Sequence, residues 1–207
     1  MRKMFKRCWT FKLRMNPLKC AFGVYSGKFL DFLVHSKGID VDPAKAVTIA
    51  TMKLPPIVKE LKNFLGKVSY IRRFIPSLAS ITSAFSKLLK KGQSFEWGEV
   101  QQTAFRRIQQ IMTNLPIVQA PICKRPLLLY LATSSYAIGT LIAQEDGSGV
   151  EQPVYYISRA LKDAETRYPK AEKACLAIVY ASQKLRHYFL TYEVWLMTKS
   201  HAIMALL

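Results

Sequence analysis

The chain has 207 residues, of which 50% are hydrophobic, and a formal net charge of +18. Disorder requires low hydrophobicity together with high charge, and a membrane-spanning helix requires an apolar run of about 18 residues, which this sequence does not contain. The composition therefore excludes a disordered chain and a membrane-embedded one, and the length predicts one or two domains at roughly 150 residues each.

The positive charge is concentrated in the first part of the chain. Residues 1–126 contain 23 Lys and Arg but six Asp and Glu, whereas residues 127–207 contain eight and seven. The cations are scattered over several predicted elements instead of along one amphipathic helix, which favours nucleic acid over a lipid surface. We expect a nucleic-acid partner and no membrane.

In the first part, apolar residues recur at helical spacing. This pattern predicts helices over residues 4–13, 45–52, 58–73, 78–89 and 96–112. Two short runs rich in aromatic and branched residues, 20–24 and 28–34, predict a hairpin whose turn lies at residues 25–27. Gly38 and Pro43 indicate a further turn.

After Pro126 the pattern changes to alternating and continuous apolar runs. It predicts strands over 127–131, 137–143 and 154–157, a long helix over 170–187 and a fourth strand over 193–197. The predicted order is βββαβ, and the whole chain is predicted to be α+β. A further helical pattern begins near the last residue, and we expect both ends of the chain to lie within a longer protein.

The cysteines and histidines do not predict a metal site. Cys8, Cys20, Cys123 and Cys175 are far apart, and no pair has CxxC spacing. Neither zinc nor a disulfide framework is expected. The basic first 15 residues lack the apolar core of a secretory signal, so we expect an intracellular protein, in the cytoplasm or the nucleus, with a transit peptide as the alternative.

Long stretches of the chain resemble one protein family. LRMNPLKCAFGVYSGKFLDFLVHSKGIDVDPAKAVTI resembles the end of the palm in gypsy-class long-terminal-repeat retrotransposon reverse transcriptases, and KELKNFLGKVSYIRRFIPSLASITSAFSKLLKKGQSFEW resembles the thumb that follows. The run from RPLLLYLATSS to LRHYF is similar to the RNase H-like domain of the same Pol polyproteins, most like the plant elements.

The resemblance implies three parts. Residues 1–54 would be a palm remnant with a hairpin like the primer grip, residues 55–126 the helical thumb and connection, and residues 127–207 an RNase H-like domain truncated at its C-terminus. The family performs RNA-directed DNA synthesis and cleaves RNA–DNA hybrids with Mg²⁺.

The family's polymerase centre is expected to be absent. Nucleotide transfer needs paired aspartates that hold two metal ions, and the family carries them in a Tyr-x-Asp-Asp turn. No such tetrapeptide occurs here, and position 1 falls just after the point where the turn would lie.

The family's nuclease site is expected to be lost as well. Its carboxylate positions on strand one, the long helix and strand four fall on Ala132, Glu172 and Lys199. An ammonium in place of a carboxylate repels divalent ions, so we expect Lys199 to replace the metal and pair with Glu172. The alternative for Glu172 is a solvated helix residue. Asp163 and Glu165 precede the helix, where a cap or turn role is expected.

The hairpin and the thumb supply the candidate nucleic-acid contacts. The family's primer grip falls on Phe29, Leu30, Asp31 and Phe32, and the family has Gly at the position of Asp31. The alternative is that the three apolar residues form the core of the hairpin. The basic candidates are Lys59, Lys62, Lys67, Arg72, Arg73, Lys87, Lys90 and Lys91. Their alternative is a solvated positive face.

We therefore expect a catalytically inactive relative of reverse transcriptase that binds RNA–DNA hybrid or duplex DNA without sequence preference, or acts as a scaffold. It would use no cofactor and no metal. Two alternatives stay open: an active subunit when another chain supplies the missing palm, and a decayed fragment without function. Exposed sheet edges would favour contact with the rest of the Pol polyprotein or self-association.

Overall fold

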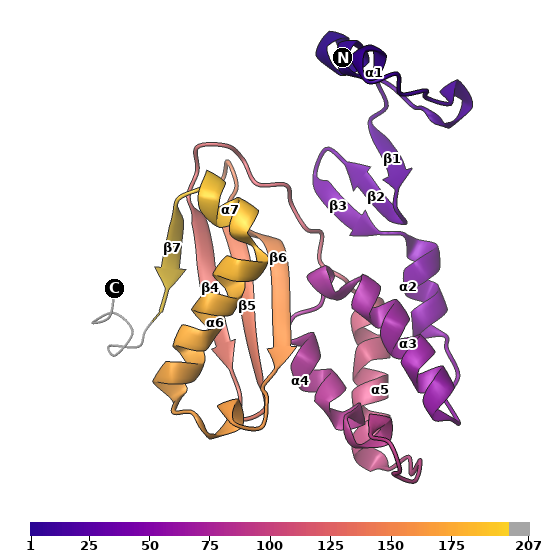
Figure 1. Cartoon of the computed structure of the whole chain (residues 1–207), viewed down its shortest axis with the longest axis vertical. Coiled ribbons are helices and arrows are strands. Elements are labelled where there is room, and N and C mark those ends of the chain that lie inside the picture. The colour runs from indigo at the N-terminus through magenta and orange to yellow at the C-terminus, as the bar shows by residue number, and fades with distance from the viewer. Residues whose placement is uncertain (199–207) are drawn as a thin grey trace.

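The computed structural model describes residues 1–198 and contains two sheets and two hydrophobic cores (Figure 1). One core is formed by the helices in the middle of the chain, and the other lies between the second sheet and the helix that covers it. Helices and sheets occur in separate stretches, which confirms the α+β prediction.

The chain begins with an isolated helix and a small sheet. Helix α1 (Arg2–Thr10) has no buried residue and stands away from the rest of the molecule (Figure 1). The sheet is antiparallel with order β1-β2-β3 and consists of β1 (Ser26–Phe29), β2 (Phe32–His35) and β3 (Gly38–Val41).

The hairpin prediction is wrong in its register. Residues 20–24 form no strand, and the turn lies at Leu30 and Asp31 instead of residues 25–27. Both turn residues have left-handed backbone angles, with φ of 47° and 60°. Asp tolerates this conformation but Leu rarely adopts it, so the sequence gives only a weak turn signal at this point, whereas Gly27 gives a misleading one.

Four helices build the first core. They are α2 (Pro43–Ala50), α3 (Val58–Tyr70), α4 (Leu78–Thr82) and α5 (Glu99–Met112). The apolar faces of α3 and α5 supply fully buried residues such as Leu61, Phe64 and Ile108. The amide of Gln109 donates to the carbonyls of Ala50 and Met52 and thereby ties α5 to the end of α2.

The predicted helix over 78–89 is broken. It consists of α4 followed by two 3₁₀ turns, Ser83–Phe85 and Lys87–Leu89. The Thr82 hydroxyl donates to the Leu78 carbonyl, and the Ser83 hydroxyl donates to the Ser80 carbonyl. Such bonds compete with helical ones, which is a physical reason for the early end of α4.

The second sheet has the order β6-β5-β4-β7. Its strands are β4 (Leu127–Thr133), β5 (Ala137–Glu145), β6 (Glu151–Ala160) and β7 (Val194–Met197). β7 is parallel to β4 and the other pairs are antiparallel, which confirms the predicted βββαβ order. Helix α6 (Lys170–Lys184) covers one face, and the predicted helix over 170–187 ends early at Leu185, where α7 (Arg186–Thr191) begins.

The connection between the two cores is hydrogen-bonded at both ends. Val118 exchanges two backbone hydrogen bonds with Ile39 of β3, at 2.7 and 3.1 Å. Further along, the buried amide of Gln144 in β5 accepts from the Ile122 N–H at 2.6 Å and donates to the Arg125 carbonyl at 3.0 Å. The connection therefore holds the first sheet and the second sheet in one arrangement.

The helical part also packs directly on the second sheet. The Ala79 N–H of α4 donates to the Ser158 hydroxyl of β6 at 2.9 Å, and the Arg73 guanidinium lies 4.6 Å from the centre of the Tyr155 ring. Gly139 of β5 lies under Ser77, where a Cβ atom would come within 3.7 Å of the Ser77 hydroxyl. No helix within residues 1–198 is long and apolar enough to span a membrane.

We expect Gly38→Ala to lower the free energy of unfolding by more than about 1 kcal/mol. A Cβ atom there would lie 2.4 Å from the Val118 carbonyl oxygen, and its φ of +145° strains any other residue. Urea unfolding followed by circular dichroism measures the effect. The control is Gly147→Ala, where a Cβ atom meets nothing within 4 Å; equal losses for both variants would contradict the close approach.

Candidate nucleic-acid interface

The tip of the first hairpin is exposed and rigidly held. Phe29 and Leu30 are 67% and 69% exposed, whereas Phe32 stacks on Tyr70 of α3 with ring centres 5.2 Å apart. The Tyr70 hydroxyl donates to the Leu30 carbonyl. Among the proposed contacts, Phe32 is therefore half-buried against the first core, and the other two apolar side chains face solvent.

The turn carries its negative charge beside lysines. The Asp31 carboxylate lies 3.4 Å from the Lys45 ammonium. The backbone of Asp31 has a φ of 60°, which glycine adopts readily. Nearby, Asp42 caps α2 through the Ala44 N–H and accepts from Lys28 at 2.9 Å. The hydrogen bond from Lys28, followed by the one from Ala44, lowers the pKa of the Asp42 carboxyl.

Two adjoining cavities cross the outer surface of α3. The first, of about 420 Å³, is lined by residues of α2, α3 and the hairpin turn, and the second, of about 580 Å³, reaches Arg72, Arg73 and Tyr155. Gly66 and Tyr70 line both, so the two cavities form one continuous surface.

We call this surface the α3 strip. Its cations are Lys45, Lys67, Arg72 and Arg73. Among the described residues that line it, Asp31 is the only acid, and that acid is paired with Lys45. A Cβ atom at Gly66 would meet nothing within 4 Å, so the middle of the strip is open to a closely approaching backbone.

The structure separates the predicted basic residues into groups. Lys67, Arg72 and Arg73 belong to the strip, Lys87 and Lys90 line a different cleft, and Lys59, Lys62 and Lys91 are exposed outside both. Sequence reasoning missed Lys45. Its position three residues after the Asp42 cap was visible, but only the packing of α2 beside α3 brings it to the strip.

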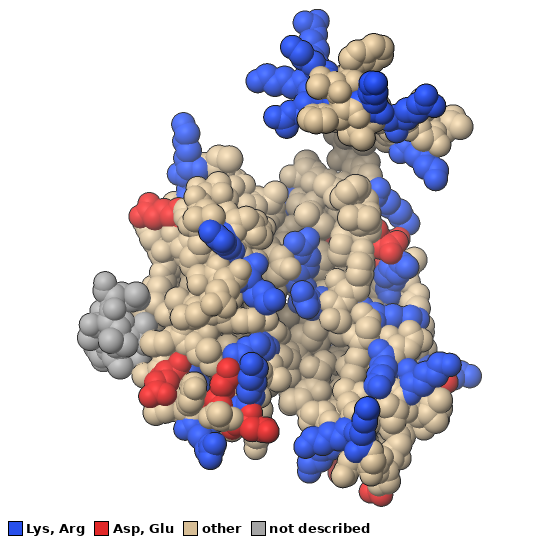
Figure 2. Space-filling model, in the orientation of Figure 1, with Lys and Arg blue, Asp and Glu red and all other residues tan. Residues whose placement is uncertain are grey.

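Charge is unevenly distributed over the visible face. Figure 2 shows Lys and Arg spread over the N-terminal helix and the helical part, while acidic side chains gather at the lower end of the second sheet. The first part of the chain is therefore strongly positive and the second part close to neutral, as the composition predicts.

The predicted nuclease positions lie apart. Leu129 and Leu131 of β4 pack in the core on the α6 side, so the alternation of a strand puts Ala132 on the opposite face. There Ala132 lines a small cavity with Ser77. Glu172 is exposed in the first turn of α6, and Lys199 lies outside the described residues.

These side chains do not fit a pair of divalent ions. Ala132 offers a methyl group where an anionic oxygen would be required, and residues 1–198 contain no cluster of three His, Cys, Asp or Glu side chains that could hold a metal. The only carboxylate at the three family positions is that of Glu172, and one carboxylate cannot offset the repulsion between two metal ions. The loss of cleavage stays a prediction, as does the pairing of Lys199 with Glu172.

The loop before α6 is held by Glu165. Its carboxylate receives two hydrogen bonds from the Arg159 guanidinium, at 2.7 and 3.1 Å, and one from the Lys162 N–H. Arg159 also lies over the Tyr180 ring of α6. The hydrogen bonds from Arg159, and then the one from Lys162, lower the pKa of Glu165. Glu165 therefore has the turn role that the sequence predicts.

Part of the chain matches a known domain family. Residues 97–196 match the family of the RNase H-like domain found in reverse transcriptase. This match begins before the second sheet and includes α5.

Related sequences come from retrotransposons. The chain is 31% identical over 188 residues to the retrovirus-related Pol polyprotein from transposon 297 of Drosophila melanogaster, covering 90% of this chain and 17% of that protein. It is 30% identical over 176 residues to the transposon Tf2-3 polyprotein of Schizosaccharomyces pombe, covering 85% of this chain and 13% of the relative. The chain thus spans less than a fifth of these relatives.

Solved structures show the same fold. The foamy viral protease-reverse transcriptase in complex with an RNA/DNA hybrid is 20% identical, with a TM-score of 0.77 over 98% of this chain and 28% of that one. The same enzyme type with double-stranded DNA gives a TM-score of 0.73 over 89% of this chain and 33% of that one.

Residues 97–196 therefore match the RNase H-like domain found in reverse transcriptase, and the chain is similar in sequence to retrotransposon Pol polyproteins and in fold to a solved reverse transcriptase. This confirms the predicted relationship. The finer assignments, to the gypsy class and to plant elements, stay predictions.

We expect Glu165→Gln to make the thermal stability less dependent on pH in the acid range. Because the folded pKa of Glu165 lies below its ordinary value of 4.5, its stabilising effect is complete above that value and is lost as the pH falls through the folded pKa. Thermal unfolding between about pH 2 and 7 should show the wild type more stable at neutral pH and the two chains converging in acid.

The matched control is Asp163→Asn in the same loop, because Asp163 forms no ion pair within residues 1–198. Its profile should follow that of the wild type. A constant offset between Glu165→Gln and the wild type down to the lowest pH would contradict the assigned pKa shift.

Proposed function

We propose that this chain binds the sugar-phosphate backbone of a nucleic-acid duplex through the α3 strip and the hairpin tip, without base preference and without cleaving it. The observation that carries the proposal is that Gly66 and Tyr70 join two cavities into one surface with four cations. Cations at a surface that a backbone can approach closely are suited to phosphates, which carry no sequence information.

The related structures support the same partner. The foamy viral enzyme was solved with an RNA/DNA hybrid and with double-stranded DNA, and this chain has the fold of that region. In our proposal the exposed Phe29 and Leu30 would contact sugars beside the strip. Asp31 disfavours phosphate at the very tip, but its pairing with Lys45 reduces that effect.

We propose the division into residues 1–54, 55–126 and 127–207 as functional parts. The two cores support a boundary in the connection that includes Val118 and Ile122. In this division the helical part supplies the cations, and the RNase H-like domain supports the strip through Tyr155, which lies under Arg73.

Binding to a labelled duplex should weaken steeply with salt, because each neutralised phosphate releases counterions. We expect Lys67→Gln together with Arg72→Gln to reduce the slope of log K against log salt by about two, at roughly 0.9 for each phosphate contact. Fluorescence anisotropy from low to moderate salt measures both slopes.

The control for charge alone is Lys184→Gln, an exposed lysine on α6 outside the strip. Its slope should equal that of the wild type. Binding that stays flat with salt, or that requires one base sequence, would refute the proposal.

We expect no cleavage of a labelled RNA–DNA hybrid by the purified chain in magnesium, because Ala132 provides no metal ligand at the first family position. Gel analysis of the RNA strand measures this. The comparison chain carries Ala132→Asp with Lys199→Asp, and a gain of cleavage in it would assign the loss to those two positions. Cleavage by the wild type would contradict the prediction of an inactive chain and favour an active nuclease.

A further inference from the structure

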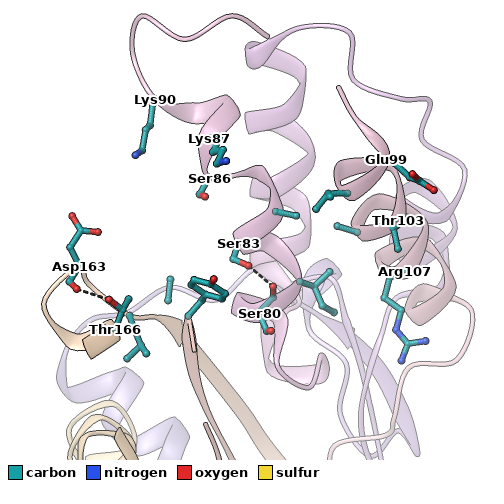
Figure 3. A pocket seen from close by; sticks show the side chains of 17 residues that line it. Ser80, Ser83, Ser86, Lys87, Lys90, Glu99, Thr103, Arg107, Asp163 and Thr166 are labelled. Carbon is teal, nitrogen blue, oxygen red and sulfur yellow. Dashed lines mark hydrogen bonds between the residues drawn. The ribbon is translucent and has the colours of Figure 1, made fainter. Parts of the chain in front are cut away.

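A second cleft lies where the helical part meets the RNase H-like sheet (Figure 3). Its volume is about 960 Å³, near the upper end of the ~300–1,000 Å³ range of ligand pockets. Its walls come from α4 and the 3₁₀ turns after it, from α5, from the turn between β4 and β5, and from the loop after β6. It shares no lining residue with the α3 strip.

The wall formed by the helical part provides groups that bind phosphate. Lys87 and Lys90 stand on the same wall of the cleft, and Arg107 lines it from α5 (Figure 3). The hydroxyls of Ser80, Ser86 and Thr103 also line the cleft, whereas those of Ser83 and Thr166 already donate to backbone carbonyls. Lysine ammonium groups and hydroxyls are the usual side-chain donors to phosphate and sugar oxygens.

The sheet provides an aromatic surface beside these donors. Tyr136, in the turn between β4 and β5, lines the cleft and is 68% exposed. Its backbone is fixed, because the Ser134 hydroxyl accepts from the N–H groups of Tyr136 and Ala137, and the Leu161 N–H donates to the Tyr136 carbonyl at 2.8 Å. A ring presented from a fixed turn is a platform on which a base can stack.

The opposite wall is equally well fixed but carries a negative charge. The Thr166 hydroxyl donates to the Asp163 carbonyl at 2.6 Å, and the buried Lys173 ammonium donates to the Thr166 carbonyl at 2.8 Å. Asp163 on this wall and Glu99 of α5 on the helical wall set two acids against the three cations of the cleft. Closely packed phosphates are therefore disfavoured, and a ligand in which phosphates alternate with neutral groups is favoured.

We infer that this cleft binds a single-stranded segment of nucleic acid, with one base stacked on Tyr136 and an adjacent phosphate on Lys87 and Lys90. A duplex hides the faces of its bases in the stack, so only an unpaired strand can use the ring. The inference goes beyond the proposed duplex binding because it uses a different surface and another class of nucleic acid.

The test uses the whole chain and two fluorescent probes, a short oligothymidylate and a duplex. Tyr136→Leu should weaken binding of the single strand by at least about fivefold, the lower end of measured base–aromatic stacking effects. Tyr136→Phe keeps the ring and should bind like the wild type. Neither change should alter binding of the duplex.

Charge variants provide an independent readout. Lys87→Gln with Lys90→Gln should weaken binding of the single strand and reduce its salt slope by about 1.4, at roughly 0.7 for each phosphate contact. Asp163→Asn should strengthen the same binding. Tyr25→Leu, at an exposed tyrosine outside the cleft, should change nothing. Circular dichroism confirms that each variant is folded.

The inference is overturned if Tyr136→Leu binds the single strand as the wild type does, or if Tyr136→Phe loses as much as Tyr136→Leu. Equal losses for both probes would also overturn it, because they would indicate one nonspecific charged surface. The strip variant Lys67→Gln with Arg72→Gln separates the two proposals, since it should affect the duplex alone.

Discussion

The arrangement of this molecule depends on the hydrogen bonds of the connection between its two cores. Val118 pairs with Ile39 of the first sheet, where Gly38 allows a carbonyl to approach too closely for any side chain. The buried amide of Gln144 binds the connection to the second sheet. Because Val118 and the Gln144 side chain are buried, releasing either attachment would leave buried polar groups without partners, which is costly. The strip and the cleft both have walls from the two parts, so both depend on these attachments.

The proposed binding surface has several cations, whereas only one of the three family positions for cleavage, Glu172, has a carboxylate. Binding through phosphates tolerates substitution, because any cation on an accessible surface contributes. Metal-dependent cleavage does not, because each ion needs several anionic oxygens in one place. Ala132 and Glu172 illustrate the difference: one provides no ligand, and the other is exposed on a helix that packs on the opposite face of the sheet.

Much of the fold was predictable because apolar periodicity decides it. The buried stripe of α3, with Leu61, Phe64 and Val68, follows the spacing read from the sequence. The hairpin was not predictable in register, because its turn uses Leu30 and Asp31 in left-handed conformations held by Tyr70, forty residues further along the chain. The candidate strip was predicted in part: its charges were visible, but its continuity across Gly66 and the contribution of Lys45 come from packing.

The sequence alone determined the element order, the basic first part and the absence of carboxylates at Ala132 and Lys199, because these are properties of composition, periodicity and residue type. Only the tertiary structure decided which cations share a surface, that Lys87, Lys90 and Tyr136 line one cleft, and that Ala132 lies on the sheet face away from α6. The physical reason is that the packing of separate elements brings residues far apart in the chain to one surface, such as Lys45 and Lys67 or Lys87 and Tyr136. A local sequence pattern carries no information about how separate elements pack.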